Sequence, residues 1–462
     1  MRKNIFVLLG SIISCYLLAT FGSGCAQVGA PTGGPKDTLA PVLVRASPEA
    51  GKINFTGNKV TIVFDEYIEL KDIQSNLLVS PVPKKNPSIS SNLKTISIKL
   101  KDTLQPNTTY SINFGNAVVD VHEENILKDF TYTFSTGSFI DSLEFKGKVF
   151  LAETGKVDST LLVYLYKNAA DSDITTRRPD YITKINSKGN FIFKHLPSAT
   201  FKIYVLKDGD GGKTYNSKTE IFAFSDADIN TAQRVEPVTL FAYAEEKEAP
   251  RALPAPKKPL EKKLKYTASL TGKTQDILQP LTFEFSNGLK KYDSSKIIVS
   301  DTNFRPLPNI IPTLDSNRKK ITINITWKPE TFYNFIMPKE GFEDSAGNAL
   351  EKTDTVRFST KKITDYGRVV LRFKNIDLAK HPVIQFLQND AIKFSFPVTS
   401  VEWSNKLIPP GEYEVRILYD TNNNGVWDPG NFKTKLQPER AISLPQKLGI
   451  KADWDNEREI QL

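Results

Sequence analysis

Oxygen-bearing side chains alternate along "DTNNNGVWD" near the C-terminus, a spacing that could serve metal chemistry. Calcium takes about six to eight oxygen ligands, which carboxylates, amides and backbone carbonyls supply. Gly425 falls at the sixth position, where a tight calcium loop needs its sharp turn. The spacing therefore predicts a weak structural calcium site, and no other cofactor. Its candidate ligands are Asp420, Asn422, Asn424, the backbone carbonyl of Val426, and Asp428.

An ordinary turn is the alternative for this segment. The twelfth position holds Asn431 instead of a bidentate glutamate, and strands are predicted on both sides instead of helices. Asn and Gly adopt the left-handed conformations that long hairpin connections use. Two carboxylates would give calcium only the weak affinity of extracellular modules, roughly 10^-4 to 10^-3 M. The earlier segment "KDGDGGKTY" keeps Asp208 and Asp210 in a shorter loop, where calcium is less expected.

Histidine and nucleophile chemistry find no support in the sequence. His122, His195 and His381 fall in three different predicted modules, and none forms a zinc-binding pair with a neighbouring histidine or cysteine. No nucleophile elbow, dinucleotide loop or phosphate loop is present. We therefore predict no catalytic residue, no enzyme and no small-molecule substrate.

Acidic and aromatic side chains keep a carbohydrate-binding or carbohydrate-active accessory role open as an alternative function. A glycosidase pair needs two carboxylates across a cleft, whereas Asp65 and Glu66 would face opposite sides of one strand. The other acids considered are Glu69, Glu123 and Glu124. Aromatic rings could stack on sugars, but at alternate strand positions they are more typical of a core. These rings belong to Trp327, Trp403, Tyr419 and Trp427.

The N-terminus has the features of a bacterial export signal. Arg2 and Lys3 precede an apolar run from Ile5 to Phe21, which closes with small residues before Cys25. A retained transmembrane anchor is the alternative, because the run is just long enough to span a bilayer. Cys15 lies inside the predicted signal, residues 1–24. Cys25 is thus the single cysteine of the mature chain and has no disulfide partner.

Cys25 resembles the lipidated first residue of bacterial lipoproteins, whose acyl chains hold the protein to a membrane. The resemblance implies palmitate-type acyl groups on Cys25, and Ala26 in place of Asp implies sorting to the outer membrane. An alternative box ending at Cys15 would leave an apolar segment stranded after cleavage. The formal charge is +9, or +7 without Arg2 and Lys3. This charge is spread out, so nucleic acid is not an expected partner.

Period-two alternation follows a Gly- and Pro-rich tether, residues 25–40, and predicts an all-β protein of tandem β-sandwiches. A charged, Pro-rich linker, residues 244–263, divides the chain. Sequence echoes across this linker indicate an internal repeat. "TLQPNTTYSINF" recurs as "ITWKPETFYNFI", and "LPSATFKIYVLKDGDGG" as "IPPGEYEVRILYDTNNN". Four modules are predicted: A (41–137), B (138–243), A′ (264–361) and B′ (362–462).

Modules A and A′ resemble bacterial Ig-like domains of the SbsA type, through "PNTTYSINFGNAVVDVHEENILKDFTYTFST" and "KPETFYNFIMPKEGFEDSAGNALEKTDTVRFST". Modules B and B′ resemble the carboxypeptidase-regulatory or transthyretin-like (prealbumin-like) sandwich, through "GNFIFKHLPSATFKI" and "IPPGEYEVRI". The first resemblance implies a cell-envelope location and no reaction. We therefore expect a non-enzymatic, lipid-anchored envelope protein that presents its modules to an unknown envelope protein or glycan for adhesion, scaffolding or partner binding.

Overall fold

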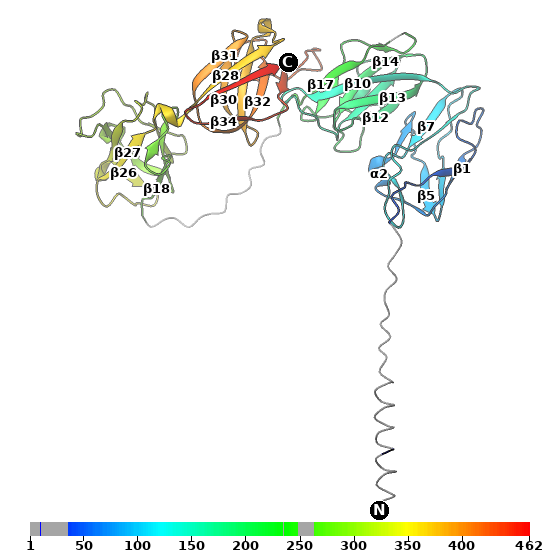
Figure 1. Ribbon diagram of the computed structural model, residues 1–462, viewed down its shortest axis with the longest axis horizontal. Coiled ribbons are helices and arrows are strands. Elements are labelled where there is room, and N and C mark those ends of the chain that lie inside the picture. Colours follow the sequence, from blue (N-terminus) through cyan, green and yellow to red (C-terminus); the bar gives the residue numbers. More distant parts are fainter. Residues whose placement is uncertain (1–9, 11–35, 234, 248–262) are drawn as a thin grey trace, which may run out of the picture. The chain divides into compact units, whose positions relative to one another are not determined.

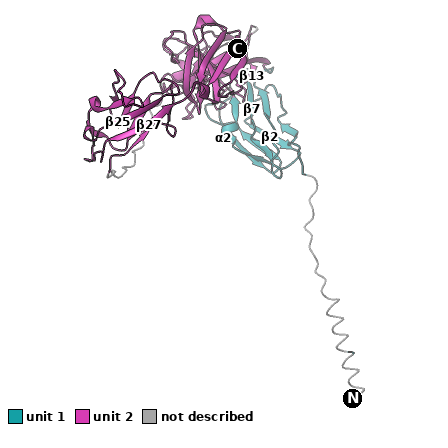
Figure 2. Cartoon of the chain, turned by 60° about the vertical axis from the view of Figure 1, so that its left-hand side comes forward, with its two compact units in different colours: residues 1–79, 83–140 teal, residues 80–82, 141–462 magenta. Residues whose placement is uncertain are grey.

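The computed structural model describes residues 36–233, 235–247 and 263–462, together with Gly10. Apart from Gly10, the predicted signal lies outside these residues, as do Cys25, most of the tether and most of the linker. The chain divides into two compact units (Figure 2). Unit 1 extends to Ile140, and unit 2 comprises residues 141–462 with 80–82. Among the described segments, no helix combines the length and the hydrophobicity that crossing a bilayer requires.

The predicted all-β fold class is confirmed, because strands build every module (Figure 1). Alternation works as expected: Val60, Ile62 and Phe64 of one strand are buried while their neighbours are more exposed. Within residues 36–233, 235–247 and 263–462, the helices are single turns. They are α2 (Ile73–Asn76), α3 (Asp173–Thr176), η1 (Ser294–Lys296), η2 (Lys339–Gly341), η3 (Ile363–Asp365) and η4 (Leu378–Lys380).

Module A contains the strands β1 (Leu43–Ser47), β2 (Lys59–Phe64), β3 (Ile68–Leu70), β4 (Leu78–Ser80), β5 (Ser88–Asn92), β6 (Thr95–Lys99), β7 (Thr109–Asn113), β8 (Val118–Asp120) and β9 (Thr131–Ser135). They form a sheet of order β1-β2-β6-β5, a sheet of order β4-β7-β9 and the pair β3-β8. The sheets enclose one apolar core that includes Phe64, Ile112 and Phe134. This arrangement is a β-sandwich with both inner faces apolar.

Module A′ contains β18 (Tyr266–Ala268), β19 (Thr274–Gln275), β20 (Leu281–Phe285), β21 (Leu289–Tyr292), β22 (Ile298–Ser300), β23 (Thr313–Leu314), β24 (Lys320–Ile323), β25 (Phe332–Met337), β26 (Phe342–Asp344) and β27 (Asp354–Thr360). Its sheets follow the order of module A: β18-β20-β24-β23, then β22-β25-β27 with β19 at its edge, and the pair β21-β26. The predicted repeat is therefore confirmed for this pair of modules.

Repeated residues occupy equivalent places in these two modules. Tyr110 on β7 pairs with Phe134 on β9, and their rings stack with centroids 5.3 Å apart. Tyr333 on β25 pairs with Phe358 on β27, and their rings stack at 5.8 Å. Both tyrosines are buried. The Pro-x-Thr-x-Tyr signature thus marks a core strand, where each aromatic pair contributes beyond the area it buries, about 0.5–1.5 kcal/mol.

Module B contains β10 (Leu143–Leu151), β11 (Leu162–Lys167), β12 (Tyr181–Lys184), β13 (Asn190–Leu196), β14 (Thr200–Leu206), β15 (Phe222–Phe224), β16 (Ile229–Asn230) and β17 (Val238–Ala242). One sheet has the order β13-β10-β17, with β10 and β17 parallel. The other has the order β12-β11-β14-β15, and β16 also pairs with β14.

Module B′ contains β28 (Gly367–Lys374), β29 (Pro382–Gln388), β30 (Ala391–Pro397), β31 (Glu402–Ile408), β32 (Gly411–Tyr419), β33 (Arg440–Ser443), β34 (Leu448–Ile450) and β35 (Asp455–Gln461). Its sheets are β31-β28-β35, with β28 and β35 parallel, and β30-β29-β32-β33, with β34 also on β32. This topology repeats module B strand for strand. Each of the two modules also has its own apolar core.

Candidate functional site

The oxygen-rich loop begins where β32 ends, and a buried carboxylate holds it closed. Asp420 is fully buried. Its Oδ1 accepts the backbone N–H of Asn424 at 3.1 Å, and its Oδ2 accepts the N–H of Gly425 at 2.6 Å. Asn423 and Gly425 have φ angles of 60° and 80°, in the left-handed region that Asn and Gly adopt most readily. These are the features that the turn interpretation predicts.

The other candidate calcium ligands form hydrogen bonds with one another. Asp428 Oδ2 accepts the side-chain amides of Asn422 at 2.5 Å and Asn424 at 2.7 Å. Val426 has an exposed side chain and donates its N–H to Asn424 Oδ1 at 2.7 Å. A cation at Asp428 would need both amides turned over, so that oxygen replaces nitrogen. Within the part of the chain that is described, no three His, Cys, Asp or Glu side chains gather in a metal-binding group.

Glu439 completes this loop, although its sequence context gives no sign of it. Glu439 is only 7% exposed. Its Oε1 accepts the N–H of Thr421 at 2.7 Å and the hydroxyl at 2.9 Å, and its Oε2 accepts the N–H of Asp428 at 3.1 Å. Trp427 Nε1 donates to the Glu439 carbonyl at 2.8 Å. Buried carboxylates at both ends therefore fix the loop, which positions the segment that follows.

The calcium prediction has a direct test in thermal stability. At a Kd of roughly 1 mM, roughly 10 mM Ca²⁺ should stabilise the folded chain by about 1.4 kcal/mol. Asp420→Ala should abolish the resulting rise in melting temperature, whereas Asp210→Ala in the counterpart loop should retain it. Differential scanning calorimetry with equimolar Mg²⁺ as the reference measures both. An unchanged melting temperature of the wild-type chain in Ca²⁺ would end the calcium hypothesis.

The segment after the loop carries Phe432 into an aromatic cluster of module B. The Phe432 ring lies 5.0 Å from Phe222, 5.5 Å from Phe224 and 5.9 Å from Tyr204, measured between centroids. Each of these three rings is at most 2% exposed. Edge-to-face packing of this kind stabilises contacts between apolar surfaces. Phe432 therefore attaches module B′ to module B, two modules that are far apart in the sequence.

Backbone hydrogen bonds strengthen the attachment. Ala441 on β33 donates its N–H to the Ala152 carbonyl at 2.8 Å. The Ser443 hydroxyl donates to the carbonyl of Thr154. Glu245 Oε1 accepts the N–H of Phe432 at 3.0 Å. The loop between β10 and β11 thus pairs with the edge of the B′ sheet, which satisfies backbone groups of an otherwise open edge strand.

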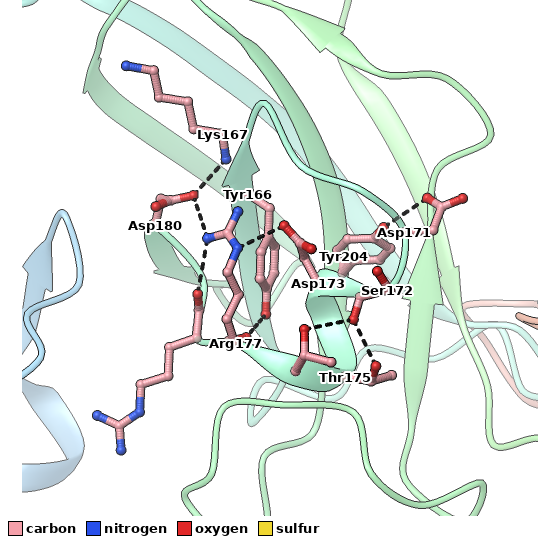
Figure 3. A network of polar contacts seen from close by, with 11 residues as sticks. Tyr166, Lys167, Asp171, Ser172, Asp173, Thr175, Arg177, Asp180 and Tyr204 are labelled. Carbon is pink, nitrogen blue, oxygen red and sulfur yellow. Dashed lines mark hydrogen bonds and ion pairs between the residues drawn. The ribbon is translucent and has the colours of Figure 1, made fainter.

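Ion pairs on the outer face of module B complete the contact. Figure 3 shows Asp171 and Tyr204, which take part in it, beside the polar contacts of Arg177. Asp171 accepts the Tyr204 hydroxyl at 3.2 Å and pairs with Lys202 at 3.2 Å. Lys435 of module B′ reaches the same carboxylate at 3.0 Å and lies 4.0 Å above the Phe432 ring. Burial raises the pKa of Asp171, but hydrogen bonds to the two lysines outweigh it and lower the pKa overall. A charged Asp171 therefore favours the docked arrangement.

Arg177 organises the other side of this network. Its Nε donates to Asp173 at 2.8 Å and its Nη1 to Asp180 at 3.1 Å. The guanidinium also lies 4.9 Å from the centre of the Tyr166 ring. With two carboxylates and a ring face as partners, Arg177 is a structural clamp that holds α3 against the sheet.

The acids that the sequence offered for catalysis gather in module A without forming a matched pair. Asp65 and Glu66 follow β2 instead of lying within a strand, so strand alternation does not separate them. Burial, then the carboxylates of Asp120, Asp65, Asp37 and Glu123, raise the pKa of Glu66. Asp65 is held by the N–H of Val42 at 2.7 Å, and Glu124 pairs with Lys71 at 2.6 Å. Neighbouring carboxylates alone do not make a catalytic site.

The histidines and aromatics that sequence analysis considered serve separate modules. His122 follows β8, His195 lies on β13 and His381 follows η4. The expectation that the tryptophans belong to cores is confirmed for Trp327, which is 3% exposed, and for Trp403, which packs against the core of B′. The described residues therefore provide no convergent group for metal or nucleophilic chemistry, and the contact between B and B′ is the most developed polar and aromatic site.

Known proteins provide one family match and several distant structural similarities. Residues 37–136 match a family described as bacterial Ig-like domain. No curated protein sequence matches the chain. Among solved structures, the Bacillus anthracis TIE protein aligns with 10% identity over 93% of this chain and 76% of that chain, with a TM-score of 0.16.

Two further structures are similar at the same level. The major pilin subunit BcpA of Bacillus cereus aligns with 11% identity over 69% of this chain and 99% of that chain, with a TM-score of 0.17. The N-terminal part of the bacterial S-layer protein SbsC aligns with 12% identity over 36% of this chain and 40% of that chain, with a TM-score of 0.16. Similarities this weak carry no functional argument. The family match is thus confined to residues 37–136, a segment that matches the bacterial Ig-like domain.

Proposed function

We propose that this protein is a non-enzymatic scaffold of the cell envelope, held to the outer membrane by acyl groups on Cys25. Its tandem modules, SbsA-type Ig-like in A and A′ and regulatory-like in B and B′, present binding surfaces to another envelope protein or a glycan. The bacterial Ig-like domain at residues 37–136 supports the envelope location. The lipoprotein-like sequence before and at Cys25 supports the anchor.

The single observation that carries a scaffold role is the docking of B′ onto B. Phe432 and the Ala441–Ala152 hydrogen bond join two modules whose sequences are separated by the linker and module A′. A chain of freely jointed modules would adopt many arrangements, and ordering it on a partner would cost conformational entropy. Docked modules avoid part of that cost. The polar groups at the contact hold the modules together instead of surrounding a reacting centre.

Labelling of cells with radioactive palmitate tests the anchor. Wild-type protein should carry the label, because acyl transfer to an N-terminal cysteine needs its thiol. Cys25→Ala should lose the label completely and release the chain into the soluble fraction, since two or more acyl chains give stable anchoring, at about 0.8 kcal/mol per buried CH₂.

Cys15→Ala provides the matched control and should keep full labelling, because Cys15 lies within the predicted signal. Label that survives in Cys25→Ala, or wild-type protein that takes up none, would contradict the proposed anchor. Label lost only in Cys15→Ala would assign the modified cysteine to the alternative position.

A further inference from the structure

A cleft of about 650 Å³ lies where module B meets module B′. Glu153, Thr154 and Lys156 line it from module B, and residues of the B′ sheet line the remainder. Arg416 of β32 is among them, and this residue is only 6% exposed. A guanidinium stays charged at all ordinary pH values, so its burial is costly unless a partner compensates the charge.

The partner of Arg416 within the protein is a neutral amide. Its Nε donates to Gln385 Oε1 at 2.8 Å, and this is the guanidinium's one hydrogen bond to the described residues. Burial lowers the pKa of Arg416, while Glu153 and Asp390 act in the opposite direction from a distance. Arg177 in module B shows the contrast, because two carboxylates contact its guanidinium (Figure 3). The guanidinium of Arg416 therefore has N–H groups beside the cleft that donate no hydrogen bond to the described residues.

Every carboxylate that lines the cleft already has a lysine partner. Glu153 pairs with Lys247 at 2.9 Å. Asp390 and Glu414 both pair with Lys156, at 3.0 Å and 2.9 Å. Glu414 also lies 4.0 Å from Lys447, so the three acids face three lysines, and the positive charge of Arg416 has no counterpart of its own. The electrostatic balance of the cleft favours an anionic guest.

The other residues that line the cleft indicate the chemistry of the rest of the ligand. The apolar lining side chains are aliphatic: Leu387, Ile392, Val415, Leu444 and Pro445. Aromatic rings, on which sugars would stack, are absent from the lining residues. A volume of this size accommodates a small ligand or the end of a peptide. A planar carboxylate matches the guanidinium fork in geometry and charge.

We propose that this cleft binds an aliphatic carboxylate, as a peptide chain ending in a leucine-like residue presents, with Arg416 pairing its carboxylate group. The aliphatic side chain of the ligand packs against Leu387 and Ile392, which are paired on neighbouring strands, on the same face of the sheet as Arg416. Because the cleft exists only where B and B′ are docked, the ligand also stabilises that docking. This proposal does not depend on how the protein is anchored.

Isothermal titration of the full chain with acetyl-glycyl-alanyl-leucine tests the proposal. The free C-terminal acid should bind, and its C-terminal amide should bind roughly tenfold more weakly or not at all, since the charge pair is lost. Arg416→Met should weaken acid binding by a similar factor. Arg368→Gln should bind normally, because Arg368 is an exposed arginine of the same module that already pairs with Asp455.

Two further probes separate the sources of the carboxylate. Binding of 4-methylpentanoate as tight as that of the peptide would identify a free aliphatic acid as sufficient, whereas much weaker binding would assign recognition to a chain terminus. Inorganic phosphate should compete poorly. Equal binding of acid and amide by the wild-type chain, tight phosphate binding, or no heat with the acid at millimolar concentration would overturn the proposal without any variant.

Discussion

Alanine at position 155 is expected to separate modules B and B′ while each stays folded. Gly155 has a φ of 66°, and a Cβ there would lie 2.5 Å from the Ala441 carbonyl oxygen and 2.8 Å from the Ser443 nitrogen. These are backbone atoms of B′ that cannot rotate away. The added atom costs about 1–3 kcal/mol in crowding, and the left-handed conformation about 1–2 kcal/mol more. We therefore expect the contact between B and B′ to break while both modules stay folded.

Hydrogen exchange provides the measurement for Gly155→Ala. The Ala441 amide donates to Ala152 in the docked arrangement, so its exchange should accelerate by roughly tenfold or more in the variant. Gly272→Ala is the matched control, because its φ is 65° but no atom lies within 4 Å of the added Cβ. Gly272→Ala should lose only the stability that the left-handed backbone conformation costs, about 1–2 kcal/mol. Equal protection of Ala441 in both variants would show that position 155 does not control docking.

Asp120→Ala should destabilise module A by about 3 kcal/mol. After Gly155→Ala, this is the second substitution for which we expect a large effect. Asp120 is 1% exposed, and its Oδ1 accepts the N–H groups of His122, Glu123 and Glu124 while its Oδ2 accepts that of Asn125. Alanine leaves these donors without a partner. For a module of about 100 residues, the melting temperature should fall by more than about 10 °C.

The same carboxylate should give module A an acid-sensitive stability. Burial raises the pKa of Asp120, but the four backbone hydrogen bonds outweigh it and lower the pKa overall. A lowered folded-state pKa means that the stabilisation is present above the unfolded value of about 3.9 and is lost as pH falls below it. Calorimetry of wild type and Asp120→Ala between about pH 3 and pH 7 should show the two curves converging at low pH.

Asp65→Ala is the control for this experiment, because Asp65 is an exposed carboxylate of module A that accepts a single backbone N–H, from Val42. Its loss should cost less than about 1 kcal/mol. A pH-independent gap between wild type and Asp120→Ala would contradict the role assigned to the charge.

The modules could be predicted from the sequence because their strands are half-buried. Alternation at Val60, Ile62 and Phe64 identifies a strand with one apolar face, and Tyr110 and Tyr333 identify the repeat. Asp344 ends β26 of module A′ as Asp120 ends β8 of module A, and it likewise accepts backbone N–H groups, those of Ala346 and Asn348, at 2.9 Å each. Local patterns of this kind depend on neighbouring residues, which is why sequence suffices for them.

The contact between B and B′ could not be predicted in the same way. Phe432 is a single aromatic in a polar segment, and nothing near it in sequence identifies its partner Phe222. Arg416 sits at an alternate strand position, where a charged residue normally indicates a solvent face, yet module B covers that face. Glu439 is one acid among charged neighbours. A charged residue flanked by apolar residues on both sides, as in "EVRIL", is the signal that could have found Arg416.

The hydrogen bond from Ala441 to Ala152, together with Phe432, closes the chain into a ring that contains the linker and module A′. Tension applied between module B and the C-terminal strand β35 therefore passes directly across the docked modules. Module A′ lies outside this mechanical path and bears load only after the contact ruptures. The contact between B and B′ therefore sets the force at which module A′ is first loaded.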